Sequence, residues 1–136
     1  MATHSKKVDP SLPLPYQAFT NDTGVTGAVT FADGDYIDFT ACLGRPAKSV
    51  KFILHGTVDI TIQFNTRLKI GKLQTEEPTE TITMPEANTM TNPIRIFNTT
   101  GVREFELPAA FAIDIVKIVD YTGTASASNN LTVIGY

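Results

Sequence analysis

Apolar and polar residues alternate most clearly at positions 49–65, where the chain reads SVKFILHGTVDITIQFN. Over residues 58–64, one parity is entirely apolar and the other entirely polar. This period of two predicts a β-strand with one face in a core and the other in water. Residues 50–55 alternate in the same way, apart from Ile53, which interrupts the otherwise polar face. We interpret Ile53 as a candidate minor contact with a partner.

A β-hairpin is the simplest way to join these two segments. A two-residue turn would place Phe52 opposite Asp59 and mix apolar with polar side chains. A register slip of one residue exchanges the two faces of a strand, so the hydrophobic pattern instead favours a three-residue loop. With that loop at His55-Gly56-Thr57, the predicted pairs are Leu54 with Val58, Phe52 with Ile60, and Val50 with Ile62.

Residues 28–41 show the same arrangement and predict a second hairpin. Val29 and Phe31 match Ile37 and Phe39 in parity across a short loop, Asp33-Gly34-Asp35. Shorter strands are expected at 68–73, 81–84, 94–97 and 102–107, with Pro, Gly and Asn between them. A single helical turn is expected at 108–111, because proline is favoured at the start of a helix.

The last two strands, 112–121 and 131–136, are apolar on both faces. Val116 and Ile118 oppose Ile113 and Ile115 in the first, and the last carries Ile134 and Tyr136 opposite Leu131 and Val133. A strand that is apolar on both faces is normally covered on both. A β-bulge that changes the phase of the strand is one explanation. A subunit interface is the other, and it makes Val116, Ile118, Ile134 and Tyr136 candidate contacts.

The pattern as a whole predicts an all-β protein, with about eight short strands in a single antiparallel β-sandwich. Eight strands in two sheets favour jelly-roll (Greek-key) topology. We place the sandwich domain at residues 20–136.

Residues 1–19 differ from the rest, because they carry three prolines and show neither helical nor strand periodicity. Proline disfavours helix and extends the residue before it, so we predict an extended N-terminal arm. Leu12, Leu14 and Tyr16 are its candidate contacts. The arm docks either on a neighbouring subunit or on its own domain, and the pattern does not separate these two.

Composition narrows the possible partners. The net charge is −3 and the only basic run is Lys6-Lys7, which argues against nucleic acid as a ligand. No apolar run approaches the length of a membrane span, and no signal-peptide pattern begins the chain. We therefore expect no membrane partner and synthesis in a cytosol-like compartment. The single cysteine, Cys42, cannot form an intrachain disulfide and is expected in the core.

We find no catalytic, cofactor or metal motif. The two histidines, His4 and His55, have no nearby partner with metal-ligand spacing, and no nucleophile signature accompanies them. Asp33-Gly34-Asp35 lacks the further ligands of a calcium loop and is better explained as a turn. Sugar platforms favour tryptophan, which is absent, so a carbohydrate-binding module would have to use the tyrosines Tyr16, Tyr36, Tyr121 and Tyr136.

The layout of the whole chain resembles small bacteriophage virion proteins, in particular jelly-roll capsid decoration (cement) proteins. The likeness lies in a proline-rich arm before a compact β domain, and in the segments SVKFILHGTVDITIQFN and IDIVKIVDYTGTASASNNLTVIGY, without a diagnostic motif. The resemblance to decoration proteins implies a non-enzymatic homotrimer that is made in the host cytoplasm and located on the capsid surface of the virion. There it would bind the major capsid protein and clamp neighbouring subunits together. A tail, baseplate or fibre component and a carbohydrate-binding β-sandwich are the alternatives.

Overall fold

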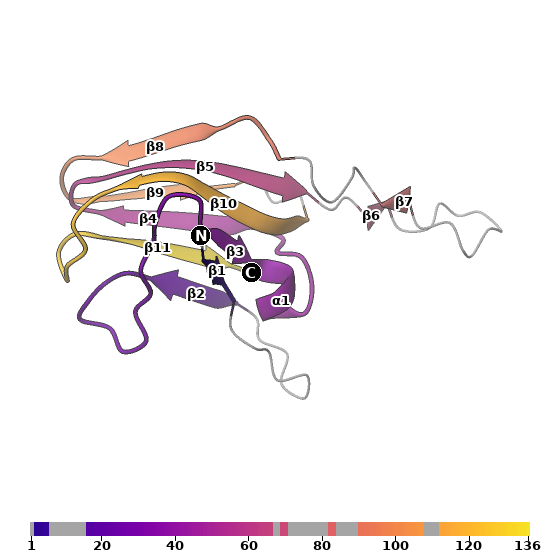
Figure 1. Cartoon of the computed structure of the whole chain (residues 1–136), viewed down its shortest axis with the longest axis horizontal. Helices are drawn as coiled ribbons and strands as arrows, with labels where there is room; N and C mark the ends of the chain where they lie inside the picture. Colours follow the sequence, from indigo (N-terminus) through magenta and orange to yellow (C-terminus); the bar gives the residue numbers. More distant parts are fainter. Residues whose placement is uncertain (1, 6–15, 67–68, 71–81, 84–89, 108–111) are drawn as a thin grey trace.

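The computed structural model describes residues 2–5, 16–66, 69–70, 82–83, 90–107 and 112–136. These residues form an all-β sandwich of two facing sheets, with one short helix at its side (Figure 1). A separate pair of two-residue strands lies away from both sheets.

Sheet A has five strands in the spatial order β1-β3-β10-β5-β8, and sheet B has four in the order β2-β11-β4-β9. In sheet A the strands are β1 (Thr3–His4), β3 (Tyr36–Asp38), β10 (Ile113–Thr122), β5 (Val58–Thr66) and β8 (Ile94–Asn98). In sheet B they are β2 (Gln17–Thr20), β11 (Asn130–Gly135), β4 (Val50–His55) and β9 (Val102–Glu106). The separate pair is β6 (Lys69–Ile70) and β7 (Ile82–Thr83).

Pairing is antiparallel throughout these sheets except between β1 and β3. Four pairs are nested along the chain: β5 pairs with β8, β4 with β9, β3 with β10 and β2 with β11. Consecutive strands of this set alternate between the sheets, except where the chain passes from β5 to β8 within sheet A. The core therefore lies between two layers whose strands come from both halves of the chain.

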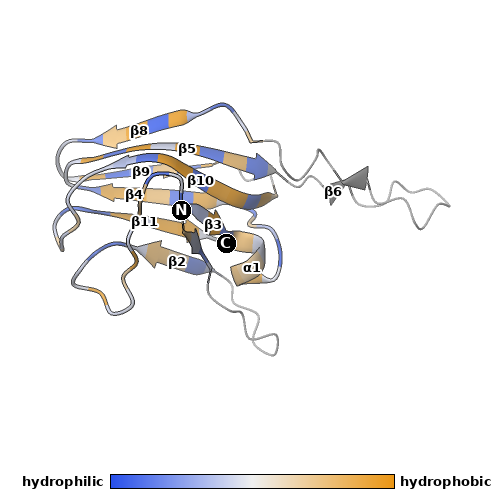
Figure 2. Ribbon diagram, viewed as in Figure 1, coloured by the Kyte–Doolittle hydropathy of each residue, from blue (hydrophilic) through white to orange (hydrophobic). Residues whose placement is uncertain are grey.

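The predicted hairpin at 49–65 is wrong, although its strands and their faces are confirmed. β4 and β5 belong to different sheets and are not paired with each other. At Gly56, which has a φ of 81°, the chain crosses from one sheet to the other. The inward residues of both strands are fully buried because each set faces the other across the core: Val50, Phe52 and Leu54 from β4, and Val58, Ile60 and Ile62 from β5. Figure 2 shows apolar residues concentrated along these strands and more polar colours in the loops.

The second predicted hairpin is also wrong. Asp33 and Gly34 do form a turn, but residues 28–32 form no strand, and Phe39 begins the helix α1 (Phe39–Leu43). Asp38 caps the helix, because its carboxylate accepts a hydrogen bond from the amide of Ala41 at 3.0 Å. Gly44 ends it in the left-handed conformation, with a φ of 73°. The helical turn predicted at 108–111 lies outside the described residues.

Phe39 fixes α1 against the sandwich. Its ring is fully buried and lies so close to Gly135 of β11 that a Cβ atom there would be 2.3 Å from the ring carbons. Cys42, in the same helix, is buried as the composition predicted. Glycine at position 135 thus permits the helix to close the end of the core between β10 and β2.

The described ends of the predicted arm are strands of the sandwich. β1 pairs with β3, and β2 pairs with β11. The predicted domain boundary between Phe19 and Thr20 therefore falls inside β2. Residues 6–15, which include Leu12 and Leu14, lie outside the described residues.

Candidate interaction surface

The outer face of sheet B brings together candidate contacts that are far apart in the sequence. In the register of the sheet, Ile53 of β4 lies opposite Thr132 of β11, and Ile134 of β11 lies opposite Lys51 of β4. Since side chains two residues apart on one strand share a face, Ile53 and Ile134 are diagonal neighbours on the outer face. Both side chains are half-buried.

Two tyrosines extend this surface. Gly135 of β11 pairs with Gln17 of β2. Tyr136 and Tyr16 are the next positions in this register, and both have the outward parity of sheet B. Tyr16 is 57% exposed and Tyr136 is 37% exposed. We call the set Tyr16, Ile53, Ile134 and Tyr136 the outer-face patch.

Charged groups border the outer-face patch on the β9 side. Lys51 forms an ion pair with Glu104 at 3.2 Å, and the hydrogen bond between them raises the pKa of Lys51. Tyr136 donates a hydrogen bond from its hydroxyl to Glu106 at 2.5 Å, and Ser49 donates a second at 3.0 Å. These bonds lower the pKa of the Glu106 carboxyl and hold the Tyr136 ring at the margin of the patch.

Val116 and Ile118 are not on this surface, and their prediction as contacts is wrong. Both are 0% exposed and form part of the core. β10 has register shifts against β5 between Ile113 and Ile115 and between Ile118 and Asp120. A bulge changes which parity faces inward. A bulge, and not a subunit interface, therefore explains why β10 carries apolar residues at both parities. By contrast, β11 has no such shift, and its outward residues Ile134 and Tyr136 remain accessible.

Phe97, which is 49% exposed on β8, was not among the residues predicted from the sequence. The signal was present: Ile94 and Ile96 share the inward parity of this strand, and Arg95 and Phe97 the outward parity. A hollow of about 780 Å³ lies beside Phe97, at the end of the sandwich where several loops meet, and was not predicted either. The alternation of residues in the sequence placed Asp59 on the solvent-facing side of its strand, but it could not show that Arg95 lies beside Asp59.

No three His, Cys, Asp or Glu side chains of the described residues lie together as a metal site would require. Within the same residues, no helix has the length and apolar character to cross a membrane. Comparisons with protein-family models, with curated proteins and with solved structures found no match for this chain. The functional proposal therefore depends on the residues and geometry of the chain itself.

Proposed function

We propose that the protein is a non-enzymatic structural subunit of a virion, which binds the outer surface of a capsid and clamps neighbouring capsid subunits. The observation that carries this proposal is the outer-face patch. Tyr16, Ile53, Ile134 and Tyr136 come from three separate places in the sequence, on β4 and at the ends of β2 and β11, yet they share one outward parity of one sheet. An accessible aromatic and aliphatic cluster with a polar rim has the composition of a protein interface.

The proposal includes jelly-roll topology for the sandwich. The four nested antiparallel pairs support it, because a jelly roll is a long hairpin wound so that its paired strands alternate between two sheets. Without the two-residue strands β1, β6 and β7, eight strands remain, four in each sheet.

We further propose that the protein acts as a homo-oligomer, with a trimer as the expected form. Several linked contacts turn modest single affinities into durable attachment, which is the requirement for a capsid clamp. Both signs of charge border the patch on its β9 side, where Lys51 of β4 lies beside Glu104 and Glu106 of β9. Such an arrangement allows a copy or a capsid subunit to form complementary pairs at the rim.

Adsorption to capsids tests this function. The full chain is mixed with capsids that lack it, and bound protein is measured after sedimentation. We expect saturable binding, and at least tenfold weaker binding for Ile134→Lys, which places a charge in the patch. Val25→Lys is the matched control, because Val25 is also exposed but lies in a loop outside both sheets.

The alternative virion role is tested in the same experiment. Purified tails replace capsids in a parallel sample. Binding to tails and not to capsids would contradict the decoration role and identify a tail, baseplate or fibre component instead. Binding to neither would contradict both roles.

A further inference from the structure

The hollow at the loop end of the sandwich lies on the outer face of sheet A, where β5 begins and β8 and β10 end. Across these strands Thr122 pairs with Asp59, and Asp59 with Phe97, so the three residues form one outward row. The loop between β10 and β11 forms the wall on one side, through Thr124, Ser126 and Asn129. Loops carried by a rigid sandwich are a common location for binding sites.

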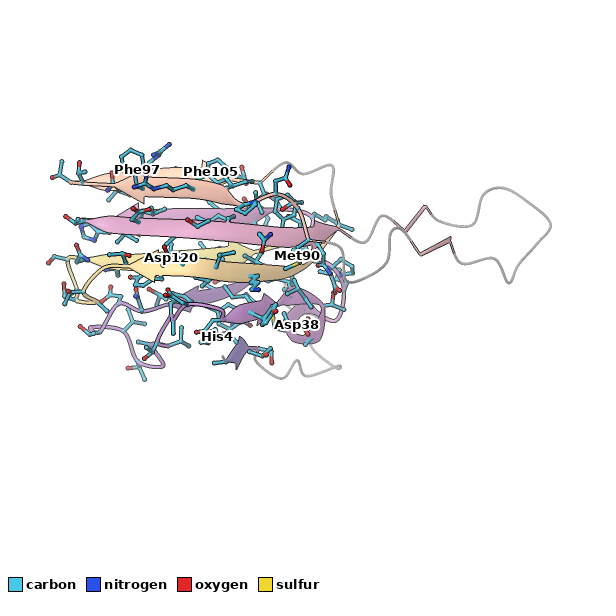
Figure 3. The ribbon with its side chains drawn as sticks, turned by 45° about the horizontal axis from the view of Figure 1, so that its top comes forward. His4, Asp38, Met90, Phe97, Phe105 and Asp120 are labelled. Atoms are coloured by element: carbon cyan, nitrogen blue, oxygen red, sulfur yellow. The ribbon has the colours of Figure 1, made fainter. Side chains whose placement is uncertain are left out.

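Phe97 supplies an apolar surface at the rim of the hollow. About half of its surface is exposed, and Figure 3 shows its side chain pointing away from the sheet. The guanidinium groups of Arg95 and Arg103 lie 5.1 Å and 5.9 Å from the centre of the ring. Arg103 also donates a hydrogen bond to the Phe97 carbonyl at 2.7 Å. These contacts hold the aromatic ring in place without burying it.

Asp59 and Arg95 form the polar part of the floor. Arg95 donates two hydrogen bonds to the carboxylate, from Nε to Oδ1 at 3.1 Å and from Nη2 to Oδ2 at 2.7 Å. These bonds lower the pKa of Asp59, so the carboxylate stays ionised and its charge is matched by the guanidinium. Both side chains remain partly exposed. Each carboxylate oxygen can accept a further bond, and Nη1 of Arg95 has no partner among the described residues.

Two asparagine side chains make the hollow a preformed structure. Asn129 bonds both the amide and the carbonyl of Thr57, at 2.7 Å and 3.1 Å, and also the carbonyl of Thr124. Asn98 donates to the carbonyls of Gly56 and Gly101, at 3.0 Å and 2.9 Å. The loops are thereby tied to one another, which reduces the ordering that a ligand would have to impose.

We propose that this hollow binds the ring of a neutral pyranose sugar, independently of the outer-face patch. The apolar C–H face of the sugar packs against Phe97. Its hydroxyls donate to the Asp59 carboxylate and accept from Arg95 and the threonine hydroxyls, because a hydroxyl does both. Thr122 and Thr124 have hydroxyls that form no hydrogen bond within the described part of the chain.

A neutral ligand fits better than an anion. The Asp59 carboxylate already occupies two donors of Arg95 and would repel a phosphate or carboxylate placed beside it. The remaining lining is uncharged, consisting of hydroxyl, amide and apolar groups. Since the hollow is partly open to solvent, a single sugar should bind weakly, and attachment to a glycan surface would depend on several copies acting together.

Titration of the full chain with neutral monosaccharides tests the proposal. Methyl glucoside, methyl galactoside and N-acetylglucosamine are added up to 100 mM, and amide shifts are followed by NMR. We expect at least one of these sugars to shift the signals of residues 57–59, 95–98 and 122–129. Phe97→Ala and Asp59→Asn should each weaken that binding at least tenfold.

The control variants are Val102→Ala and Asp120→Asn. They shorten an exposed apolar side chain and neutralise an exposed carboxylate, respectively, but neither residue lines the hollow. A glycan array, run in parallel, separates recognition of a free sugar from recognition of a glycan chain, and binding in either format at the hollow supports the proposal. Silence in both formats, shifts confined to other residues, or a preference for inorganic phosphate would overturn it.

Discussion

Asp35 is the residue that ties the N-terminal strand to the sandwich. It is 1% exposed, and its Oδ1 accepts a hydrogen bond from the Ala2 amide at 2.9 Å. Its Oδ2 lies 3.0 Å from the Ala32 amide and 2.9 Å from Nε2 of His4. The His4 ring in turn packs edge-on to Phe31 at 5.5 Å. One carboxylate therefore holds β1, β3 and the loop before β3 together.

The same carboxylate makes stability depend on pH. Burial alone would raise the pKa of Asp35, but the hydrogen bonds from Ala2, His4 and Ala32 outweigh it and lower the pKa below the ordinary value of 3.8. A lowered pKa in the folded state stabilises the fold above pH 3.8, and this stabilisation is lost as pH falls through the folded-state pKa.

We predict that Asp35→Asn reduces the free energy of unfolding at neutral pH by roughly 1–3 kcal/mol, because the charge-assisted hydrogen bonds to the buried Asp35 carboxylate are lost. It should also reduce the loss of stability below pH 4. Urea unfolding between pH 3 and pH 7 measures both effects. Asp120→Asn, an exposed position on the outer side of β10, serves as the control (Figure 3). Equal pH profiles for wild type and Asp35→Asn would contradict the role of Asp35.

At the scale of elements, α1 depends on its caps. A helix of five residues gains little from its own hydrogen bonds, so the bond from Ala41 to Asp38 and the buried Phe39 must define it. We predict that Asp38→Ala lowers the free energy of unfolding by about 0.5–2 kcal/mol, whereas Asp38→Asn, which keeps a capping oxygen, changes it much less. Chemical denaturation of the three proteins measures the difference. Equal free energies of unfolding for Asp38→Ala and Asp38→Asn would show that the capping hydrogen bond does not contribute to stability.

The strands β4 and β5 were predictable from the sequence, but their partners were not. The parity of residues 50–55 and 58–64 identified the buried face of each strand correctly. In a sandwich, however, a chain that crosses from one sheet to the other also turns its apolar residues toward the same core. A hairpin and such a crossing therefore leave the same pattern, and only pairing with the distant strands β11 and β10 separates them. The helix α1 did carry a local signal, since Asp38 and Gly44 match the preferred residues at helix ends.

The outer-face patch was predictable in part from the same alternation of apolar and polar residues. Ile53 and Ile134 stood out because each is apolar at an outward position of its own strand. Their position on one face follows from a register between strands 81 residues apart (134 − 53), which no local pattern contains. Val116 and Ile118 were misassigned because a bulge shifts parity without a reliable local mark.

The whole molecule has two outward faces with different proposed roles. The outer face of sheet B carries the outer-face patch, which we propose as the contact with copies of the chain and with a capsid. The loop end of sheet A carries the hollow beside Phe97, which we propose as a sugar site. Because the two lie on different sheets, a variant that loses the patch should still bind a single sugar, and a variant that loses the hollow should still bind capsids.

The native mass of the chain in solution shows whether the outer-face patch joins copies of the chain. Sedimentation velocity is measured for the wild type, Ile134→Lys and Val25→Lys over a range of micromolar concentrations, with circular dichroism to establish that each is folded. The account predicts trimers of wild type and Val25→Lys, and folded monomers of Ile134→Lys. A wild-type chain that stays monomeric throughout, or an Ile134→Lys variant that assembles as the wild type does, would contradict it.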